Sequence, residues 1–225
     1  MRGLLYKFWS SILYLVKPFS QKMRSLLEPL ILYLVLFLPG LMTSAGEINV
    51  SFSSAQHLFR FFTYNLPALA LVWFLLRNEK AARALARPSL HDLLICGLSL
   101  AALIAIASLL SALSSLFTPQ SMTLETPDDA VGWFVLCLSC LGTGYLEESW
   151  FRLYLPLKLW NVGIVSGTAI ALSTLLFALC HRYEGLWGVL NAALAGVVLS
   201  LIVWKKKSFH GIALAHALYN TLSFV

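Results

Sequence analysis

Charged residues are scarce in this chain of 225 residues: Asp, Glu, Lys and Arg make up 12% of it, whereas 59% of the residues are hydrophobic. Soluble domains are roughly half apolar, and a chain of this length has too little polar surface to cover so many apolar side chains in water. The mean hydropathy of +0.80 agrees with this conclusion. The scarcity of charge excludes an ordinary soluble domain and predicts a chain surrounded largely by lipid.

The motifs of several other protein classes are missing. The sequence has no P-loop, no glycine-rich dinucleotide pattern and no His-Glu-x-x-His zinc motif. No basic face alternates with stacking aromatic residues, so nucleic acid is not expected as a partner. The cysteines all lie in apolar runs and are expected to be small buried side chains rather than disulfides. They are Cys96, Cys137, Cys140 and Cys180.

Long apolar runs are abundant instead. A helix that crosses a bilayer needs about 20 predominantly apolar residues, and about seven runs approach this length. They cover residues 27–43, 58–76, 90–117, 131–155, 163–181, 186–204 and 208–225. The sequence therefore predicts an all-α fold, a polytopic transmembrane helix bundle with about seven spans.

Basic residues alternate between the linkers. All of the 16 Lys and Arg residues except Arg60 and Arg182 fall before the first predicted span or in every second linker after it, with Arg152 and Lys158 assigned to the linker after the fourth. Positive linkers face the cytoplasm, so the N-terminus is expected there. Because the chain has no endoplasmic-reticulum retention signal, we expect the inner membrane of a bacterial cell.

Residues 1–25 mix large apolar and aromatic side chains with five basic residues. This composition predicts a basic amphipathic helix that lies on an anionic membrane surface. Two alternatives remain open, namely a solvated basic leader and a signal peptide cleaved near residues 43–45. In the run 186–204, small residues recur every fourth position and predict a close helix contact. These are Gly188, Ala192, Gly196 and Ser200.

Ionisable groups interrupt the fourth apolar run. Placing such a group near the bilayer centre costs roughly a few kcal/mol or more, so these groups normally face partners inside the protein. If the helix continues, Glu148 and Arg152 share a face and can pair, while Glu147 points about 100° away. A carboxylate without a cation beside it in an apolar site can serve as a general base. The alternative is an ordinary charged cluster at the cytoplasmic end of the helix.

Two further polar groups lie in apolar runs. His181 ends the fifth run, and His216 and Asn220 share a face of the last. Taken singly, they could be an interfacial cap and hydrogen-bonded packing between helices. Taken with Glu147, they are the parts needed to activate water and to hold an oxyanion. Glu147 would take the proton of the water, His181 would orient it, and the other two would donate to the oxyanion.

The order and spacing of these residues resemble the three motifs of the CPBP family, the CAAX-type prenyl proteases and bacteriocin-processing enzymes also called the Abi family. The motifs are Glu-Glu-x-x-x-Arg at 147–152, Phe-x-x-x-His at 177–181 and His-x-x-x-Asn at 216–220. The resemblance implies an intramembrane endopeptidase of glutamic type. Its catalytic core would be 131–225, preceded by transmembrane helices in 26–130, within a single membrane domain.

The resemblance also implies roles for the motif residues. In the family, the first glutamate and the histidine of the second motif activate water, and the third motif stabilises the oxyanion. Carried over, the catalytic residues are Glu147, His181, His216 and Asn220, and the supporting residues are Glu148 and Arg152. No cofactor is expected. The alternative is zinc bound by Glu147, His181 and His216, because two histidines and a carboxylate form a common zinc site.

The depth of His181 conflicts with this assembly. At about 1.5 Å per residue, His181 lies near the far end of the run 163–181, whereas Glu147 and His216 lie in the cytoplasmic half. The three meet only if this helix starts late, tilts or bends. A late start is possible because Gly163 and Gly167 lie at its beginning.

The expected partners are the lipid bilayer and a membrane-associated peptide or protein. A leader peptide or a C-terminal anchor is favoured over a prenylated CAAX terminus, since prenylated substrates are not expected in a bacterial membrane. Two other functions remain open: a non-proteolytic scaffold or chaperone of the same fold, and a small proton-coupled transporter with Glu and His as a relay. The sequence shows no paired halves of the kind that transporters commonly have.

Overall fold

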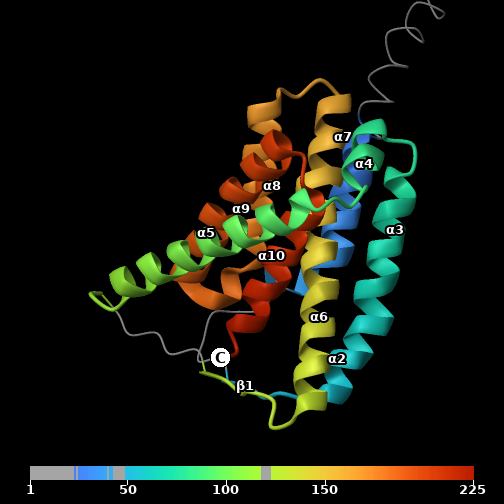
Figure 1. Ribbon diagram of the computed structural model, residues 1–225. Helices are drawn as coiled ribbons and strands as arrows, with labels where there is room; N and C mark the ends of the chain where they lie inside the picture. The colour runs from blue at the N-terminus through green and yellow to red at the C-terminus, as the bar shows by residue number, and fades with distance from the viewer. Residues whose placement is uncertain (1–22, 24, 40, 43–48, 118–122) are drawn as a thin grey trace, which may run out of the picture.

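The computed structural model describes residues 23, 25–39, 41–42, 49–117 and 123–225, and these form a bundle of helices (Figure 1). Within this part of the chain the only strands are two residues long each and pair in parallel. The elements are the helix Ser25–Pro39, β1 (Asn49–Val50), α2 (Ser54–Arg60), η1 (Phe61–Asn65), α3 (Leu66–Leu76), α4 (Lys80–Leu85), α5 (His91–Ser114), β2 (Thr123–Leu124), α6 (Ala130–Glu148), η2 (Ser149–Tyr154), α7 (Leu155–Asn161), α8 (Ser166–Cys180), η3 (Arg182–Glu184), α9 (Gly185–Lys206) and α10 (Phe209–Leu222).

The predicted all-α membrane bundle is confirmed, and the protein is a multi-pass membrane protein. Among the described residues, four continuous helices are long and apolar enough to cross a bilayer: Ser54–Leu76, His91–Ser114, Ala130–Asn161 and Arg182–Lys206. The helices Ser25–Pro39 and Ser166–Cys180 are shorter, and α10 has 14 residues. A helix coincides with each predicted run, but the count of seven complete spans is not confirmed.

One end of the bundle collects the basic linkers. Asn161 after α7 donates from Nδ2 to Oε1 of Glu79 at 3.1 Å, and His210 at the start of α10 bonds through Nε2 to the carbonyl oxygen of Ala86 at 3.0 Å. These contacts bring together three linkers that are far apart in sequence. We call this the basic end; it carries Arg77, Lys80, Arg83, Arg87, Lys158 and Lys205 to Lys207.

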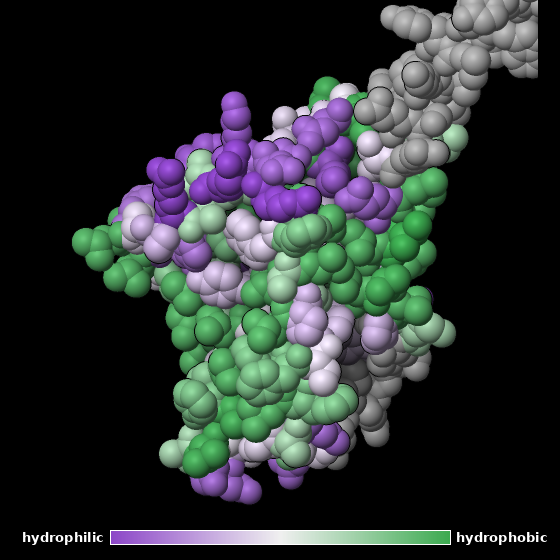
Figure 2. Space-filling view, turned by 90° about the vertical axis from the view of Figure 1, so that its right-hand side faces the viewer, coloured by the Kyte–Doolittle hydropathy of each residue, from purple (hydrophilic) through white to green (hydrophobic). Residues whose placement is uncertain are grey.

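The opposite, acidic end carries Glu125, Asp128 and Asp129. There the backbone N–H of Phe52 donates to Oε2 of Glu125 at 3.0 Å. Figure 2 shows a broad apolar belt between a strongly hydrophilic upper end and smaller hydrophilic patches below. The predicted alternation of linkers therefore holds in space, while the cytoplasmic placement of the basic end remains a prediction. The predicted amphipathic segment 1–25 and the alternative cleavage site at 43–45 lie outside the described residues, except for Met23 and Ser25.

Two long helices each widen by one π turn, at η1 and η2. Pro67 and Pro156 each lie two residues after the end of one of these turns. Proline has no N–H to donate and its ring crowds the carbonyl group four residues earlier, so the preceding turn opens to a wider spacing. Such π turns recur at functional sites, and both lie next to buried polar side chains of this bundle.

Close backbone contacts set the helix positions. A Cβ atom added to Gly144 of α6 would lie 3.0 Å from the carbonyl oxygen of Ala213 and from the nitrogen of Ala217, both on α10. On α9, a Cβ atom at Gly196 would lie 2.9 Å from Cγ2 of Thr174 on α8. The predicted small-residue contact of α9 is thus confirmed, with α8 as its partner.

All four cysteines are free. Three of them are buried as predicted, but Cys137 is exposed on α6, where the prediction of a buried side chain is wrong. An apolar thiol is tolerated on the outside of a helix that lipid surrounds.

Candidate active site

The helix α6 continues through the charged segment into η2 and α7, so the charges lie inside a long helix and not at its end. Nε of Arg152 lies 3.2 Å from Oε2 of Glu148, and both side chains are fully buried. The predicted pair is confirmed. The assignment of Arg152 to a basic linker is wrong, because the apolar helix runs on to Asn161 and encloses the guanidinium in the core.

The guanidinium of Arg152 has unused donors. Its Nη1 and Nη2 atoms are buried and have no hydrogen-bond partner among the described residues. Its Cζ atom lies 4.4 Å from the centroid of the Phe177 ring, a distance at which an aromatic ring attracts a cation. The buried cation is therefore held by one carboxylate and one ring face.

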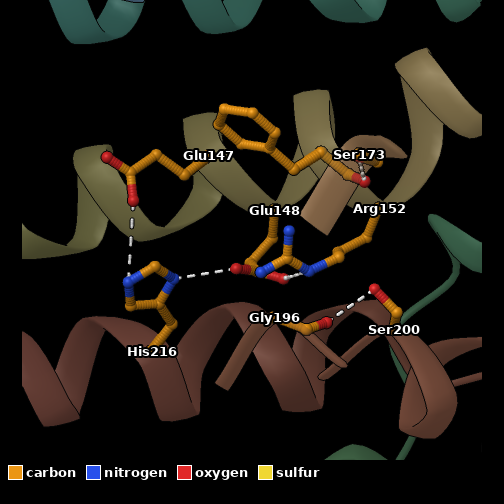
Figure 3. Close-up of polar contacts among 8 residues, drawn as sticks. Glu147, Glu148, Arg152, Ser173, Gly196, Ser200 and His216 are labelled. Atoms are coloured by element: carbon orange, nitrogen blue, oxygen red, sulfur yellow. Dashed lines mark hydrogen bonds and ion pairs between the residues drawn. The ribbon is translucent and has the colours of Figure 1, made fainter. Parts of the chain in front are cut away.

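His216 on α10 lies between the two glutamates (Figure 3). Its Nδ1 donates to Oε1 of Glu148 at 2.8 Å, and its Nε2 lies 3.6 Å from Oε2 of Glu147. The second separation is too long for a direct hydrogen bond. Glu148 therefore contacts both Arg152 and His216, a link that the sequence analysis did not foresee.

The two adjacent glutamates differ in environment. The side chain of Glu148 is 0% exposed and that of Glu147 is 17% exposed. Glu147 forms no ion pair with Lys or Arg among the described residues, and its close charged neighbour is His216. The prediction that one glutamate is tied down and the other left over is confirmed, with the difference that an imidazole faces the free one.

His181 follows the last residue of α8. Its Nδ1 bonds to the carbonyl oxygen of Phe177 at 2.9 Å. Because a carbonyl oxygen only accepts, Nδ1 carries the proton and a neutral ring keeps its lone pair on Nε2. The Phe177 ring centroid lies 4.6 Å from that of His181 and 5.9 Å from that of His216. Both imidazoles therefore contact one phenylalanine ring.

The helix α8 starts later than the predicted run, as one solution to the conflict of depth requires. The turn before α8 contains Gly163 with a φ of 93°, a conformation that glycine adopts without strain, and the helix begins only at Ser166. Glu147 interacts electrostatically with Cys180 and Tyr183, the residues on either side of the His181 segment. The end of α8 therefore lies within electrostatic range of the free carboxylate.

Asn220 lies one helical turn beyond His216 on α10. Its side chain is partly buried and has no hydrogen-bond partner among the described residues. The amide therefore keeps its donors free, on the same helix face as His216.

The zinc alternative requires three ligands around one point. Within the described part of the chain, no three His, Cys, Asp or Glu side chains are grouped closely enough to hold a metal ion. The set Glu147, His181 and His216 is therefore not arranged as zinc ligands, since zinc needs its ligand atoms at about 2 Å.

Four aromatic or charged residues around the site were given no role there by the sequence analysis. Phe177 begins the second motif, and its spacing from His181 was the available signal. Arg60 departs from the charge alternation, which was a signal too. Tyr64 and Tyr183 interact electrostatically with Glu147, but no pattern in the sequence marks them.

A comparison with known families bears on this site. Residues 129–222 match the family model described as type II CAAX prenyl endopeptidase, Rce1-like. This segment is thus similar to the CAAX-type endopeptidase family. It holds all three motifs, so the predicted resemblance is confirmed over this CAAX-type segment. Searches of curated proteins and of solved structures give no match.

Proposed function

We propose that the protein is an intramembrane endopeptidase that hydrolyses a peptide bond of a membrane-associated peptide or protein with water activated by Glu147. One observation carries the proposal. On α6, Arg152 neutralises one glutamate in the core, while the adjacent Glu147 stays partly exposed beside His216 and the end of α8. A structural ion pair needs only one carboxylate, so the second is available for chemistry.

The reaction begins with a water molecule beside Glu147. The gap of 3.6 Å between Glu147 Oε2 and His216 Nε2 allows a water next to the pair to contact both groups. The carboxylate takes one proton as the water oxygen bonds to the carbonyl carbon of the substrate and the carbonyl π electrons move to its oxygen, and Nε2 of His181 accepts a hydrogen bond from the remaining O–H. General-base assistance of this kind contributes about 10²–10⁴-fold.

The tetrahedral oxyanion then receives hydrogen bonds. Asn220 donates from its free amide, and His216 donates from Nε2 in its protonated form, with Nδ1 already bonded to Glu148. Donors held in place in a low-dielectric site stabilise the developing charge without reorganisation. When the carbon–nitrogen bond breaks, the protonated Glu147 returns its proton to the leaving amine.

Glu148 and Arg152 act through His216 in this scheme. The carboxylate of Glu148 fixes the orientation of the imidazole, and Arg152 stabilises that carboxylate in the core. They are positioning residues, and this is how we explain the supporting role that the resemblance to the family implies. No step needs a metal ion, because Glu147 and His181 supply the base and the donors supply the electrostatic stabilisation.

The substrate class remains that expected from the sequence: a leader peptide or a C-terminal anchor rather than a prenylated CAAX terminus. The bilayer is the second partner and nucleic acid is not one. We further propose the inner membrane of a bacterial cell, with the basic end and the N-terminus in the cytoplasm.

The decisive test replaces Glu147 by glutamine. Wild type and Glu147→Gln are reconstituted in liposomes with quenched fluorescent peptides of three kinds: leader-like, anchor-like and prenylated CAAX. Cleavage should fall by at least about 10²-fold, with unchanged membrane insertion and melting temperature. Equal turnover by the variant would remove Glu147 from the mechanism. A cellular phenotype that survives the substitution would favour the non-proteolytic scaffold. Proton uptake into vesicles that is lost on the substitution would favour the transporter.

A further inference from the structure

Two basic residues depart from the charge alternation, and the structure treats them differently. Arg182 donates from Nη2 to the carbonyl oxygen of Leu41 at 2.7 Å. Arg60 is exposed and, among the described residues, forms no ion pair and no hydrogen bond. It lies in the continuous helix Ser54–Leu76, one of the four candidate spans. A cation without an anion is unusual in such a helix.

Arg60 precedes a residue that packs on α6, the helix that carries Glu147. Its neighbour Phe61 packs on α6 at Gly142, where an added Cβ atom would lie 2.8 Å from Cδ2 of the ring. Gly142 precedes Glu147 by five residues, or about 8 Å along the helix axis. The Cζ atom of Arg60 lies 5.9 Å from the ring centroid of Tyr64.

The charges of Arg60 and Glu147 act on the same surroundings. Both interact electrostatically with Tyr64 on η1, Cys140 on α6 and Tyr183 on η3. Three side chains on three different elements therefore lie within range of both charged groups. This places the free cation and the free carboxylate around one region of the molecule.

We propose that Arg60 binds a carboxylate of the substrate peptide, two or three residues from the bond that is cleaved. An extended chain advances about 3.3–3.6 Å per residue, so the axial spacing of about 8 Å between Gly142, where Phe61 packs, and Glu147 corresponds to two or three residues. The inference rests on the proposed function of Glu147. The carboxylate comes from the C-terminus of the substrate or from an Asp or Glu side chain, since a guanidinium binds either with the same fork of donors.

A plainer role for Arg60 is to extend its side chain to the membrane surface, as long basic side chains do near helix ends. Arg77 is the matched control. It follows the same continuous helix at the basic end, is exposed, and places its Cζ atom 3.8 Å from the Phe74 ring centroid. Substitution of either arginine by glutamine removes one exposed charge, but only Arg60 lies beside the site.

The test measures peptide binding apart from cleavage. Fluorescent apolar decapeptides are titrated against the Glu147→Gln protein in nanodiscs, alone and combined with Arg60→Gln or Arg77→Gln. The peptides are a C-terminal acid, the corresponding amide, and the amide with one Asp three residues from its end. Charge-assisted hydrogen bonds predict about ten- to hundredfold tighter binding of a carboxylate peptide than of the plain amide, lost with Arg60→Gln and kept with Arg77→Gln.

The result also identifies the source of the carboxylate. Preference for the acid alone assigns the C-terminus, and preference for the Asp peptide alone assigns a side chain. Equal binding of all three peptides, or equal effects of the two arginine variants, overturns the proposal and leaves surface anchoring as the role of Arg60.

Cleavage of the same peptides by the protein with Glu147 intact separates the two proposals. Cleavage without any carboxylate preference sinks the role of Arg60 and keeps the peptidase. Arg60-dependent binding without cleavage of any peptide sinks the peptidase and keeps the carboxylate site.

Discussion

Two of the polar clusters in the described part of this bundle combine a carboxylate with a histidine. The first joins the linkers at the basic end; we call it the clamp. Asp92 accepts from the backbone N–H of Ser89 at 2.7 Å, from the Ser89 hydroxyl at 3.1 Å and from the Ser208 hydroxyl. His210 bonds through Nε2 to Ala86 and through Nδ1 to the hydroxyl of Tyr145, each at 3.0 Å. All of these bonds close within the protein.

The second cluster is the centre, formed by Glu147, Glu148, Arg152, His181 and His216. Here Nη1 and Nη2 of Arg152 have no hydrogen-bond partner among the described residues, and Glu147 faces an imidazole at 3.6 Å. The contrast shows which polar groups serve the fold. A cluster whose donors and acceptors are all satisfied stabilises a helix junction. A cluster with unpaired donors beside an accessible carboxylate keeps groups that can bind a ligand.

The largest effect on this contrast is expected from Glu148→Met. Removing the carboxylate leaves Arg152 buried without a counter-charge, which costs about 3–5 kcal/mol in comparable proteins. It also frees His216, so cleavage should be lost. The measurements are the melting temperature in detergent and the cleavage rate in liposomes.

The double variant Glu148→Met/Arg152→Met separates folding from positioning. Replacing a whole buried ion pair by apolar side chains is often neutral, so stability should return. Cleavage should not return, because His216 still lacks its partner. A double variant that cleaves at the wild-type rate would show that the pair only supports the fold and that the centre resembles the clamp.

A smaller effect is expected from Gly144→Ala. The new Cβ atom meets backbone atoms of Ala213 and Ala217 at 3.0 Å, and backbone cannot move as a side chain tip does, so α10 is displaced from α6. We expect a loss of about 1–3 kcal/mol and a fall in cleavage of up to about 10²-fold, since His216 shifts relative to Glu147.

Gly97→Ala is the control for this substitution. No atom lies within 4 Å of a Cβ added at Gly97 on α5, so the protein should be unchanged or slightly more stable. Equal losses in the two alanine variants would mean that the α6–α10 contact does not set the geometry of the centre.

Much of this molecule could be predicted from its sequence, because lipid imposes simple rules. The apolar runs gave the helices, and the spacing of Glu148 and Arg152 gave their ion pair. Contacts between distant segments could not be predicted, since no local pattern shows that Nδ1 of His216 bonds to Glu148. The assignment of Arg152 to a linker was wrong because hydropathy underestimates a helix that carries a neutralised pair through its core.

The lengths of the shorter helices could not be predicted from the sequence either. The run 163–181 gave a helix, but the turn at Gly163 delays its start to Ser166. The motifs indicated which residues belong together, whereas the packing of His181 and His216 on the one ring of Phe177 could be seen only in the structure.

A modest effect, on stability alone, is expected from Asp92→Asn in the clamp. The amide oxygen of asparagine still accepts some of the hydrogen bonds of Asp92, so the loss should be about 1 kcal/mol. The cleavage rate measured below the melting temperature should not change, because no clamp residue touches the proposed water. A cleavage rate that falls while the melting temperature stays constant would place the clamp in the mechanism and end the contrast drawn between the clusters.

No effect at all is expected from removing metal ions. The unpaired carboxylate and imidazoles of the centre could in principle bind a metal ion instead of water. Among the described residues, however, no three potential metal ligands are grouped there. Prolonged treatment with a strong chelator should therefore leave both cleavage and the melting temperature unchanged. The same treatment of Glu147→Ala is the control, since a true zinc site would lose metal affinity with that ligand. Inhibition that added zinc reverses in the wild type, together with zinc binding that the variant has lost, would overturn the mechanism of Glu147 as a free base.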